Sequence, residues 1–215
     1  MIYRDADRIE TYMTDALEHI QDNKGLRHLF NRMSLIDELY THVAGVAKLG
    51  TALALDVGLP EKDIREVALA GMLHDAGKIH VPREILFKPG RLTDEEFDAI
   101  KKHPLDGYED CKPYVDNEDV LQMILNHHEK TDGSGYPNGT SDLSVKCRIL
   151  TVADIFSALV EPRLYHRERS VVDALEFIAC FNDIDQDLVS RLHKLVEPEE
   201  YAYEPAHRNF AKREN

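Results

Sequence analysis

The chain has 215 residues, a net charge of −14 and a pI near 5.2. This excess of acid excludes a uniformly basic face for duplex nucleic acid, although bound cations could still reverse the local field for a small anionic substrate. The three cysteines form no CxxC pair, the N-terminus lacks signal-peptide character and no apolar stretch is long enough for a membrane span. We therefore expect a cytoplasmic, soluble protein with reduced thiols and no membrane partner.

Apolar residues recur at helical spacing along most of the chain. In residues 5–22 they fall at i, i+3, i+4 and i+7, and Gly25 is expected to break this helix. A second helix is predicted from about residue 35 to 56, followed by a turn at Gly58. Further helices are predicted over residues 61–76, 93–102, a short stretch from 104, 117–128, 144–160, 170–180 and 185–196.

Local signals mark where these helices begin and end. Gly77 is a C-terminal stop signal, and Thr93 with Glu96 forms a capping box that opens a helix. Residues 79–90 and 132–143 are rich in Gly and Pro and predict ordered loops. No strand pair is indicated, so the predicted fold class is all-α.

Three regions are expected. Residues 1–33 form an N-terminal helical extension, residues 34–197 form the main domain and residues 198–215 form a polar tail. The apolar stripe of residues 1–33 suits either a helix contact in a homodimer or packing on its own domain.

His74 and Asp75 close a helix of otherwise apolar residues, which indicates that they are partly buried. Neighbouring residues on a helix diverge by roughly 100°. The pair can therefore straddle two metal ions, with Asp75 as a bridging carboxylate. Taken alone, such a dipeptide is more often a surface pair.

Glu38 and His42 are four residues apart and share a helix face, which alone would be an ordinary exposed polar pair. Asp154 lies among apolar residues of a predicted helix. A buried unpaired carboxylate is costly, so this aspartate is expected to face a cation.

Three further histidines lie at predicted helix ends: His103 before a proline, and His127 and His128 before the loop 132–143. A set of imidazoles and carboxylates without thiolates favours iron, manganese, zinc or nickel over copper(I) or an iron–sulfur cluster. The combined pattern predicts a multinuclear metal site.

These residues belong to five motifs: HDAGKIHVP from residue 74, ILFKPGRLT from 85, HPLDG from 103, HHEKTDGSGYP from 127 and VADIF from 152. In order and spacing they resemble the HD-GYP family, a branch of the HD phosphohydrolase superfamily. The resemblance spans residues 38–166. It implies an HD-type helical bundle with two or three divalent metals, commonly iron or manganese, that hydrolyses cyclic di-GMP to linear pGpG and on to GMP.

The resemblance also implies roles for single residues. The first metal would be held by His42, His74, Asp75 and Asp154, and the second by the bridging Asp75 with His103, His127 and His128. Glu38 stands where trinuclear members have an extra carboxylate, so a third metal is expected to fit.

Substrate contacts are implied for two cationic residues. Lys78 resembles the phosphate-contacting lysine of the family, and Arg163 resembles a substrate-binding arginine. Lys88, on the loop 79–90, is a candidate for the second phosphate, with a solvated surface position as the alternative.

Two cations about 3.5–4 Å apart would lower the pKa of a shared water for in-line attack on phosphorus. Asp75 and Lys78 are then the expected catalytic residues, because the lysine offsets charge that develops on the phosphate. The proton donor for the leaving group stays open, with His80, Asp106 and Glu129 as candidates.

The sequence also departs from the family pattern. Residues 163–166 lack its proline and final basic residue, Ser157 stands where a second aspartate is usual and Thr131 replaces an aromatic residue. These changes leave two alternatives open. One is an HD-type phosphohydrolase acting on another cyclic dinucleotide or nucleotide, and the other is a catalytically weak nucleotide-binding module.

Overall fold

The computed structural model describes residues 5–161 and 169–196, with the side chains of residues 37 and 38 left out. Over these residues the chain is helical with turns and loops, and none of them forms a strand, as the predicted all-α class requires. The elements are α1 (Ala6–Asp22), α2 (Lys24–Ser34), α3 (Asp37–Val57), α4 (Glu61–Leu73), the 3₁₀ helix η1 (Ala76–His80), α5 (Arg83–Leu86), α6 (Asp94–Ile100), α7 (His103–Cys111), α8 (Glu118–Asn126), α9 (Val145–Val160), α10 (Val171–Ile178) and α11 (Gln186–Val196).

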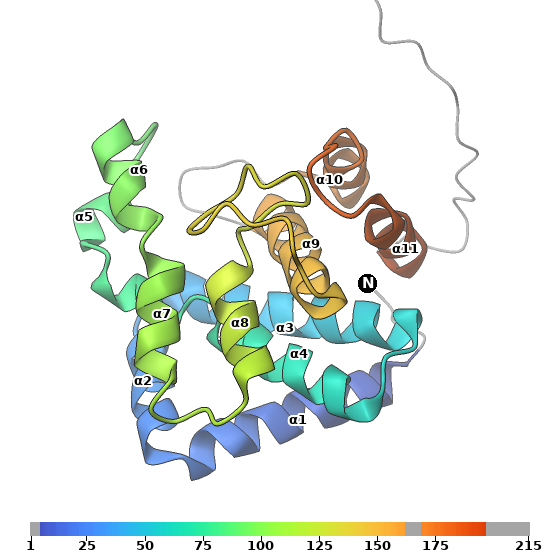
Figure 1. The fold of residues 1–215 in the computed structure, drawn as a ribbon, viewed down its shortest axis with the longest axis horizontal. Coiled ribbons are helices and arrows are strands. Elements are labelled where there is room, and N and C mark those ends of the chain that lie inside the picture. The colour runs from blue at the N-terminus through green and yellow to red at the C-terminus, as the bar shows by residue number, and fades with distance from the viewer. Residues whose placement is uncertain (1–4, 162–168, 197–215) are drawn as a thin grey trace, which may run out of the picture.

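The helices α3 and α4 form an antiparallel pair at the centre of the bundle (Figure 1). Gly58 ends α3 in the left-handed conformation, with φ of 81°. A Cβ atom on Gly71 would lie 2.5 Å from the Cα of Ala47, so the glycine allows the two backbones to approach closely. This close pair is the platform on which the other helices pack.

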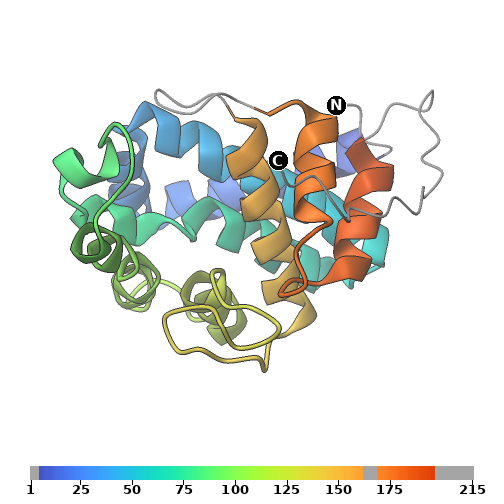
Figure 2. The ribbon, with the colours of Figure 1, turned by 90° about the horizontal axis from the view of Figure 1, so that it is seen from above.

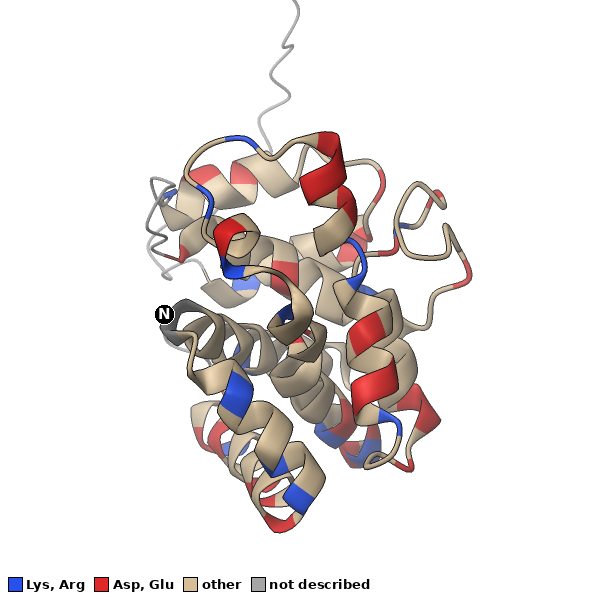
Figure 3. Ribbon diagram, turned by 90° about the vertical axis from the view of Figure 1, so that its left-hand side faces the viewer, with Lys and Arg blue, Asp and Glu red and all other residues tan. Residues whose placement is uncertain are grey.

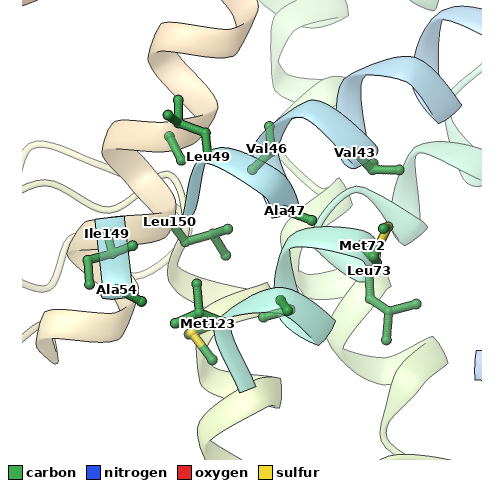
Figure 4. Close-up of a cluster of buried hydrophobic side chains, with 14 of the residues drawn as sticks. Val43, Val46, Ala47, Leu49, Ala54, Met72, Leu73, Met123, Ile149 and Leu150 are labelled. Carbon is green, nitrogen blue, oxygen red and sulfur yellow. The ribbon is translucent and has the colours of Figure 1, made fainter. Parts of the chain in front are cut away.

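The remaining helices surround this pair. Helix α9 packs on α3, α8 packs on α4, and α7 packs on η1 and α8. Side chains from α3, α4, α8 and α9 meet in one aliphatic cluster that includes Val46, Leu73, Met123 and Leu150 (Figure 4). The helices α10 and α11 lie at the end of the molecule opposite α5–α7 (Figure 2).

The N-terminal helices share this core. The buried side of α1 carries Ile9, Tyr12, Ala16 and Ile20, which belong to the same hydrophobic cluster as the central helices. Its apolar stripe therefore packs on its own chain. The division at residues 33 and 34 stays a prediction.

The expected break at Gly25 is wrong in one respect, because a separate helix, α2, begins there. The Asn23 side chain caps this helix by accepting hydrogen bonds from the amides of Gly25 and Leu26. A Cβ atom on Gly25 would collide with the ring of Tyr114. The glycine thus serves packing against the segment after α7.

Other boundaries agree with the sequence to within a few residues. The Thr93–Glu96 capping box is present at the start of α6. Helix α4 ends at Leu73, a turn earlier than predicted, and the loop expected over 79–90 contains the short helix α5. His74 keeps helical dihedral angles, and the chain departs from them at Asp75, with φ of −95° and ψ of 12°.

The helices α6 and α7 carry Asp and Glu residues but no Lys or Arg, and Figure 3 colours these acidic positions red on the ribbon. Such a surface repels the phosphate backbone of a duplex nucleic acid. Among the described residues, no helix combines the length and the apolar character that crossing a membrane requires.

Candidate metal centre

The structure brings seven of the predicted metal-binding residues together at one place. They come from separate helices and helix ends: His42 from α3, His74 and Asp75 from the turn after α4, His103 from the start of α7, His127 and His128 from the turn after α8, and Asp154 from α9. All except His128 are buried, and the side chain of His128 is 23% exposed.

Asp75 lies at the centre of this group. Its Oδ1 atom is 3.3 Å from Nε2 of His103 and 3.9 Å from Nε2 of His127. Its Oδ2 atom is 3.4 Å from Nε2 of His74 and 3.7 Å from Nε2 of His42. The two oxygens thus face two different sets of imidazoles, as a bridging carboxylate would.

Asp154 lies beside both sets. Its Oδ1 atom is 3.0 Å from Nε2 of His42 and 3.9 Å from Nε2 of His74, and its Oδ2 atom is 3.6 Å from Nδ1 of His128. Donor atoms within 4.8 Å of one another form three groups: His42, His74 and Asp75; His74, His127 and Asp154; and His103, His127 and His128. The second of these groups shares His74 with the first and His127 with the third, and the three are compatible with the two ligand sets predicted from the sequence.

Three of the imidazoles are oriented by the backbone. Nδ1 of His74, His103 and His127 each donates to the carbonyl oxygen three residues earlier, at 2.8, 2.7 and 2.7 Å. The lone pair of each ring then lies on Nε2, which points to Asp75. Such a second hydrogen bond is what fixes the tautomer of a metal-binding histidine.

Several of these nitrogen and oxygen atoms lack a hydrogen-bond partner in the protein and could instead coordinate a cation. Nε2 of His74 and Oδ1 of Asp75 are buried without a hydrogen-bond partner. Nε2 of His103 and Nε2 of His127 face each other at 3.2 Å, although both rings donate from Nδ1. Buried polar atoms are rarely left unpaired, so the donor set fits divalent metal ions.

The charges of the site follow from burial and from these contacts. Burial alone would raise the pKa of Asp75, but Lys78 and His74 hold it well below its usual range. The pKa of Asp154 is likewise held well below its usual range, mainly by the hydrogen bond with His42. Burial lowers the pKa of His127 well below its usual range and that of His128 to about 3. The site thus presents two ionised carboxylates and, at His127 and His128, neutral imidazoles, which are protonation states that bind metals.

The two described candidates for substrate contact lie in different surroundings. Nζ of Lys78 is 2.6 Å from Oδ2 of Asp75, so this lysine is part of the centre. Lys88 forms an ion pair with Glu96 at the start of α6. The side chain of Glu38 and the whole of Arg163 lie outside the described residues.

Residues 135–137, Gly-Tyr-Pro, lie against the backbone of His128 and Glu129. A Cβ atom on Gly135 would lie 2.5 Å from Cα of Glu129, and the amide of Tyr136 donates to the carbonyl of His128 at 3.2 Å. The Tyr136 ring lies over His128, with ring centroids 4.7 Å apart. Gly135 is therefore needed for close approach, and Tyr136 covers one side of the centre.

Glu129, a candidate proton donor from the sequence, has another role in the structure. Its carboxylate is fully buried and accepts hydrogen bonds from the amides of Asn138, Gly139 and Thr140. These bonds hold the loop that carries Tyr136. His80, another candidate, pairs with Asp110 on α7.

Sequence reasoning missed two residues at the site. Gly77 touches the first turn of α7, and Glu161 contacts His42 from the end of α9. A glycine after a helix has an ordinary interpretation as a stop signal. Glu161 is 119 residues from His42, and no spacing rule links residues so far apart.

The metal-free protein should lose stability between pH 6.5 and pH 9. Burial alone would lower the pKa of His42, but hydrogen bonds with Asp154 and Glu161 raise it from 6.5 to about 9. The folded state then holds this proton more tightly than the unfolded chain. The contribution of protonated His42 to the free energy of unfolding is fully present below pH 6.5. It is lost as the pH rises through about 9, which lowers the free energy of unfolding by roughly 1–3 kcal/mol.

Urea unfolding with a chelator, at pH 6.5 and at pH 9, measures this loss. His42→Gln should remove most of the difference, because glutamine does not titrate in this range. His28→Gln, at an exposed position on α2, is the control and should keep it. An equal free energy of unfolding at both pH values would contradict the charged state of His42.

Comparisons with known proteins agree with this geometry. The model of the HD domain family matches residues 13–188. A cyclic di-GMP phosphodiesterase of Pseudomonas aeruginosa is 36% identical over an alignment of 196 residues, and the match covers 84% of this chain and 47% of the relative. A 3'3'-cGAMP-specific phosphodiesterase of Vibrio cholerae is 35% identical over 141 residues, or 65% of this chain and 33% of the relative.

The fold agrees with that of a solved structure as well. An HDG"Y"P protein of Bdellovibrio bacteriovorus superposes with a TM-score of 0.61 at 22% identity, covering 72% of this chain and 51% of that protein. The chain spans about half or less of the length of the curated relatives. Because the family model covers most of the sequence, the chain belongs to the HD domain family, which confirms the resemblance seen in its HD-GYP motifs.

Proposed function

We propose that the chain is a metal-dependent phosphodiesterase that hydrolyses cyclic di-GMP to linear pGpG and further to GMP. The observation that carries this proposal is the convergence of four Nε2 atoms, from His42, His74, His103 and His127, on the carboxylate of Asp75. The relative from Pseudomonas aeruginosa, named as a cyclic di-GMP phosphodiesterase, supports the choice of substrate.

The proposed metal ligands are those of the sequence prediction: His42, His74, Asp75, His103, His127, His128 and Asp154, with Glu38 for a third ion. We propose two or three divalent ions, iron or manganese before zinc or nickel. Bound there, such ions would lower the pKa of a water molecule and neutralise charge on the scissile phosphate.

The chain's own residues would orient the substrate. Lys78 neutralises Asp75 in the structure and has a side chain that is 18% exposed. Its ammonium group can therefore turn to a phosphate oxygen when another positive charge balances the carboxylate. Lys88 and Arg163 are the proposed contacts to the rest of the dinucleotide.

Turnover by the full chain tests the proposal. Protein loaded anaerobically with Fe(II) or Mn(II) should convert cyclic di-GMP to pGpG, and chromatography of the reaction mixture detects the product. Metal analysis of the same sample should show a loaded site. Chelator-treated protein is the control. Absence of hydrolysis in fully loaded protein would rule the proposal out.

A second substrate is favoured by one comparison. The Vibrio cholerae relative is named as specific for 3'3'-cGAMP, and residues 163–166 of this chain depart from the usual substrate-binding segment. A higher kcat/KM for 3'3'-cGAMP than for cyclic di-GMP would select this alternative. Tight binding of either nucleotide without hydrolysis would select a binding module.

Location and assembly are also proposals. We propose a cytoplasmic protein, as the sequence predicts. A homodimer through residues 1–33 would use the polar sides of α1 and α2, because their apolar sides are buried within the chain. The molar mass in solution, measured by light scattering, tests the dimer.

A further inference from the structure

His42 is held differently from the other buried imidazoles of the centre. His74, His103 and His127 each use a free backbone carbonyl at or beside a helix end. His42 lies inside α3, where the carbonyl oxygens are taken by helical hydrogen bonds. A side chain must therefore satisfy its Nδ1 atom, and the structure places Oε2 of Glu161 there at 2.8 Å.

The position of Glu161 follows from the end of α9. It directly follows the last helical residue, and its amide donates to the carbonyl of Ser157, one turn earlier, at 3.0 Å. Its side chain is 16% exposed. Residues four apart on a helix share a face, so the side chains at positions 157 and 161 both face α3.

Gly45 on α3 makes room for this carboxylate. A Cβ atom at position 45 would lie 2.6 Å from Oε1 of Glu161 and 3.8 Å from Oγ of Ser157. Both side chains thus contact the same patch of α3, three residues after His42. A carboxylate from either position could approach Nδ1 of the imidazole.

We propose that Glu161 is a positioning residue for His42. By accepting the hydrogen bond from Nδ1, Glu161 fixes the tautomer and the ring plane so that Nε2 faces Asp75 and Asp154. The inference rests on the proposed function only in taking His42 as a metal ligand. It does not depend on which nucleotide is cleaved.

Metal binding without any nucleotide tests the inference. Chelator-stripped full-length protein is titrated anaerobically with Mn(II) by calorimetry. Glu161→Ala should weaken binding by about 10- to 100-fold, the range typical for loss of a group that orients a metal-binding histidine. The Mn(II) affinity of Glu161→Gln should lie between those of the unaltered chain and Glu161→Ala, because its amide oxygen still accepts the hydrogen bond but carries no charge.

Rescue by a relocated carboxylate is the decisive comparison. The double variant Ser157→Asp with Glu161→Ala should regain most of the lost affinity, because it restores a carboxylate one turn earlier on the same face. Glu176→Ala, which removes an exposed carboxylate on α10, is the matched control and should bind Mn(II) like the unaltered chain.

A spectroscopic measurement separates positioning from general stability. In Zn(II)-loaded protein, nitrogen NMR should show His42 as a single tautomer with its proton on Nδ1, and Glu161→Ala should bring exchange between tautomers. If that variant fails to fold, the Mn(II) titration of Glu161→Gln still tests the inference, because its affinity should fall below that of the unaltered chain.

Two results would overturn the inference. One is unchanged Mn(II) affinity in Glu161→Ala. The other is a reduced number of bound ions that Ser157→Asp does not restore, because Glu161 would then be a ligand itself. Protein that cleaves no cyclic dinucleotide but shows the expected affinities would refute the proposed function and leave this inference intact.

Discussion

Asp75→Asn should empty the metal centre and reduce hydrolysis of cyclic di-GMP by at least about 1,000-fold, or ~4 kcal/mol in the activation barrier. The carboxylate lies at the centre of the described ligands and faces both imidazole sets, through Oδ1 to His103 and through Oδ2 to His74. Asparagine offers one neutral oxygen in place of two charged ones. Metal analysis after anaerobic loading, with initial rates on the same samples, measures both effects.

Asp142→Asn is the control for this variant, because it removes an exposed carboxylate on the segment between α8 and α9. It should keep the metal content and the rate of the unaltered chain. Circular dichroism should show both variants folded, so that the comparison concerns the centre. If Asp75→Asn retained its metal and its activity, the assignment of Asp75 as a bridge would be wrong.

Gly77→Ala should destabilise the fold and the centre together, by about 1–3 kcal/mol or more. The added Cβ would collide with the carbonyl oxygen of His103 and would lie 2.5 Å from the amide nitrogen of Gly107. Backbone atoms cannot rotate away, so α7 would have to move, and it carries His103 with it. Urea unfolding and Mn(II) titration should both show the loss.

Gly107→Ala probes the same contact from the other side and serves as the matched comparison. Its Cβ would lie 3.1 Å from the amide nitrogen of Gly77 and 3.4 Å from the side chain of Ile124, a much milder approach. Alanine also gains about 0.5–1 kcal/mol over glycine inside a helix. Equal losses in the two variants would show that contact with η1 does not position His103.

Apolar periodicity was sufficient to predict most of the helices, because most of them bury one apolar face against neighbouring helices. Helix α2 escaped prediction because a glycine in a first turn has the same sequence signal as a break. Only the structure shows the Asn23 cap and the Tyr114 ring that account for Gly25. The early end of α4 at Leu73 likewise depends on the turn that brings Asp75 to the centre.

The candidate ligands could be predicted because motifs preserve residue types at fixed local spacings. The supports of those ligands could not, since they are tertiary contacts between distant segments. Glu161 reaches His42 from the end of α9, and Glu129 acts on the amides of residues 138–140 instead of on a leaving group. In both cases the sequence shows a carboxylate but not the group that it contacts.

The ligand cluster also has a consequence for the lifetime of the protein. Its members come from five of the helices or their ends, and His42 and Asp154 alone are 112 positions apart in the chain. An ion bound only by the folded state adds its binding energy to the stability of the whole bundle. Metal starvation would therefore expose the chain to proteolysis as well as stop its chemistry, so metal supply would set both the abundance of the protein and its rate.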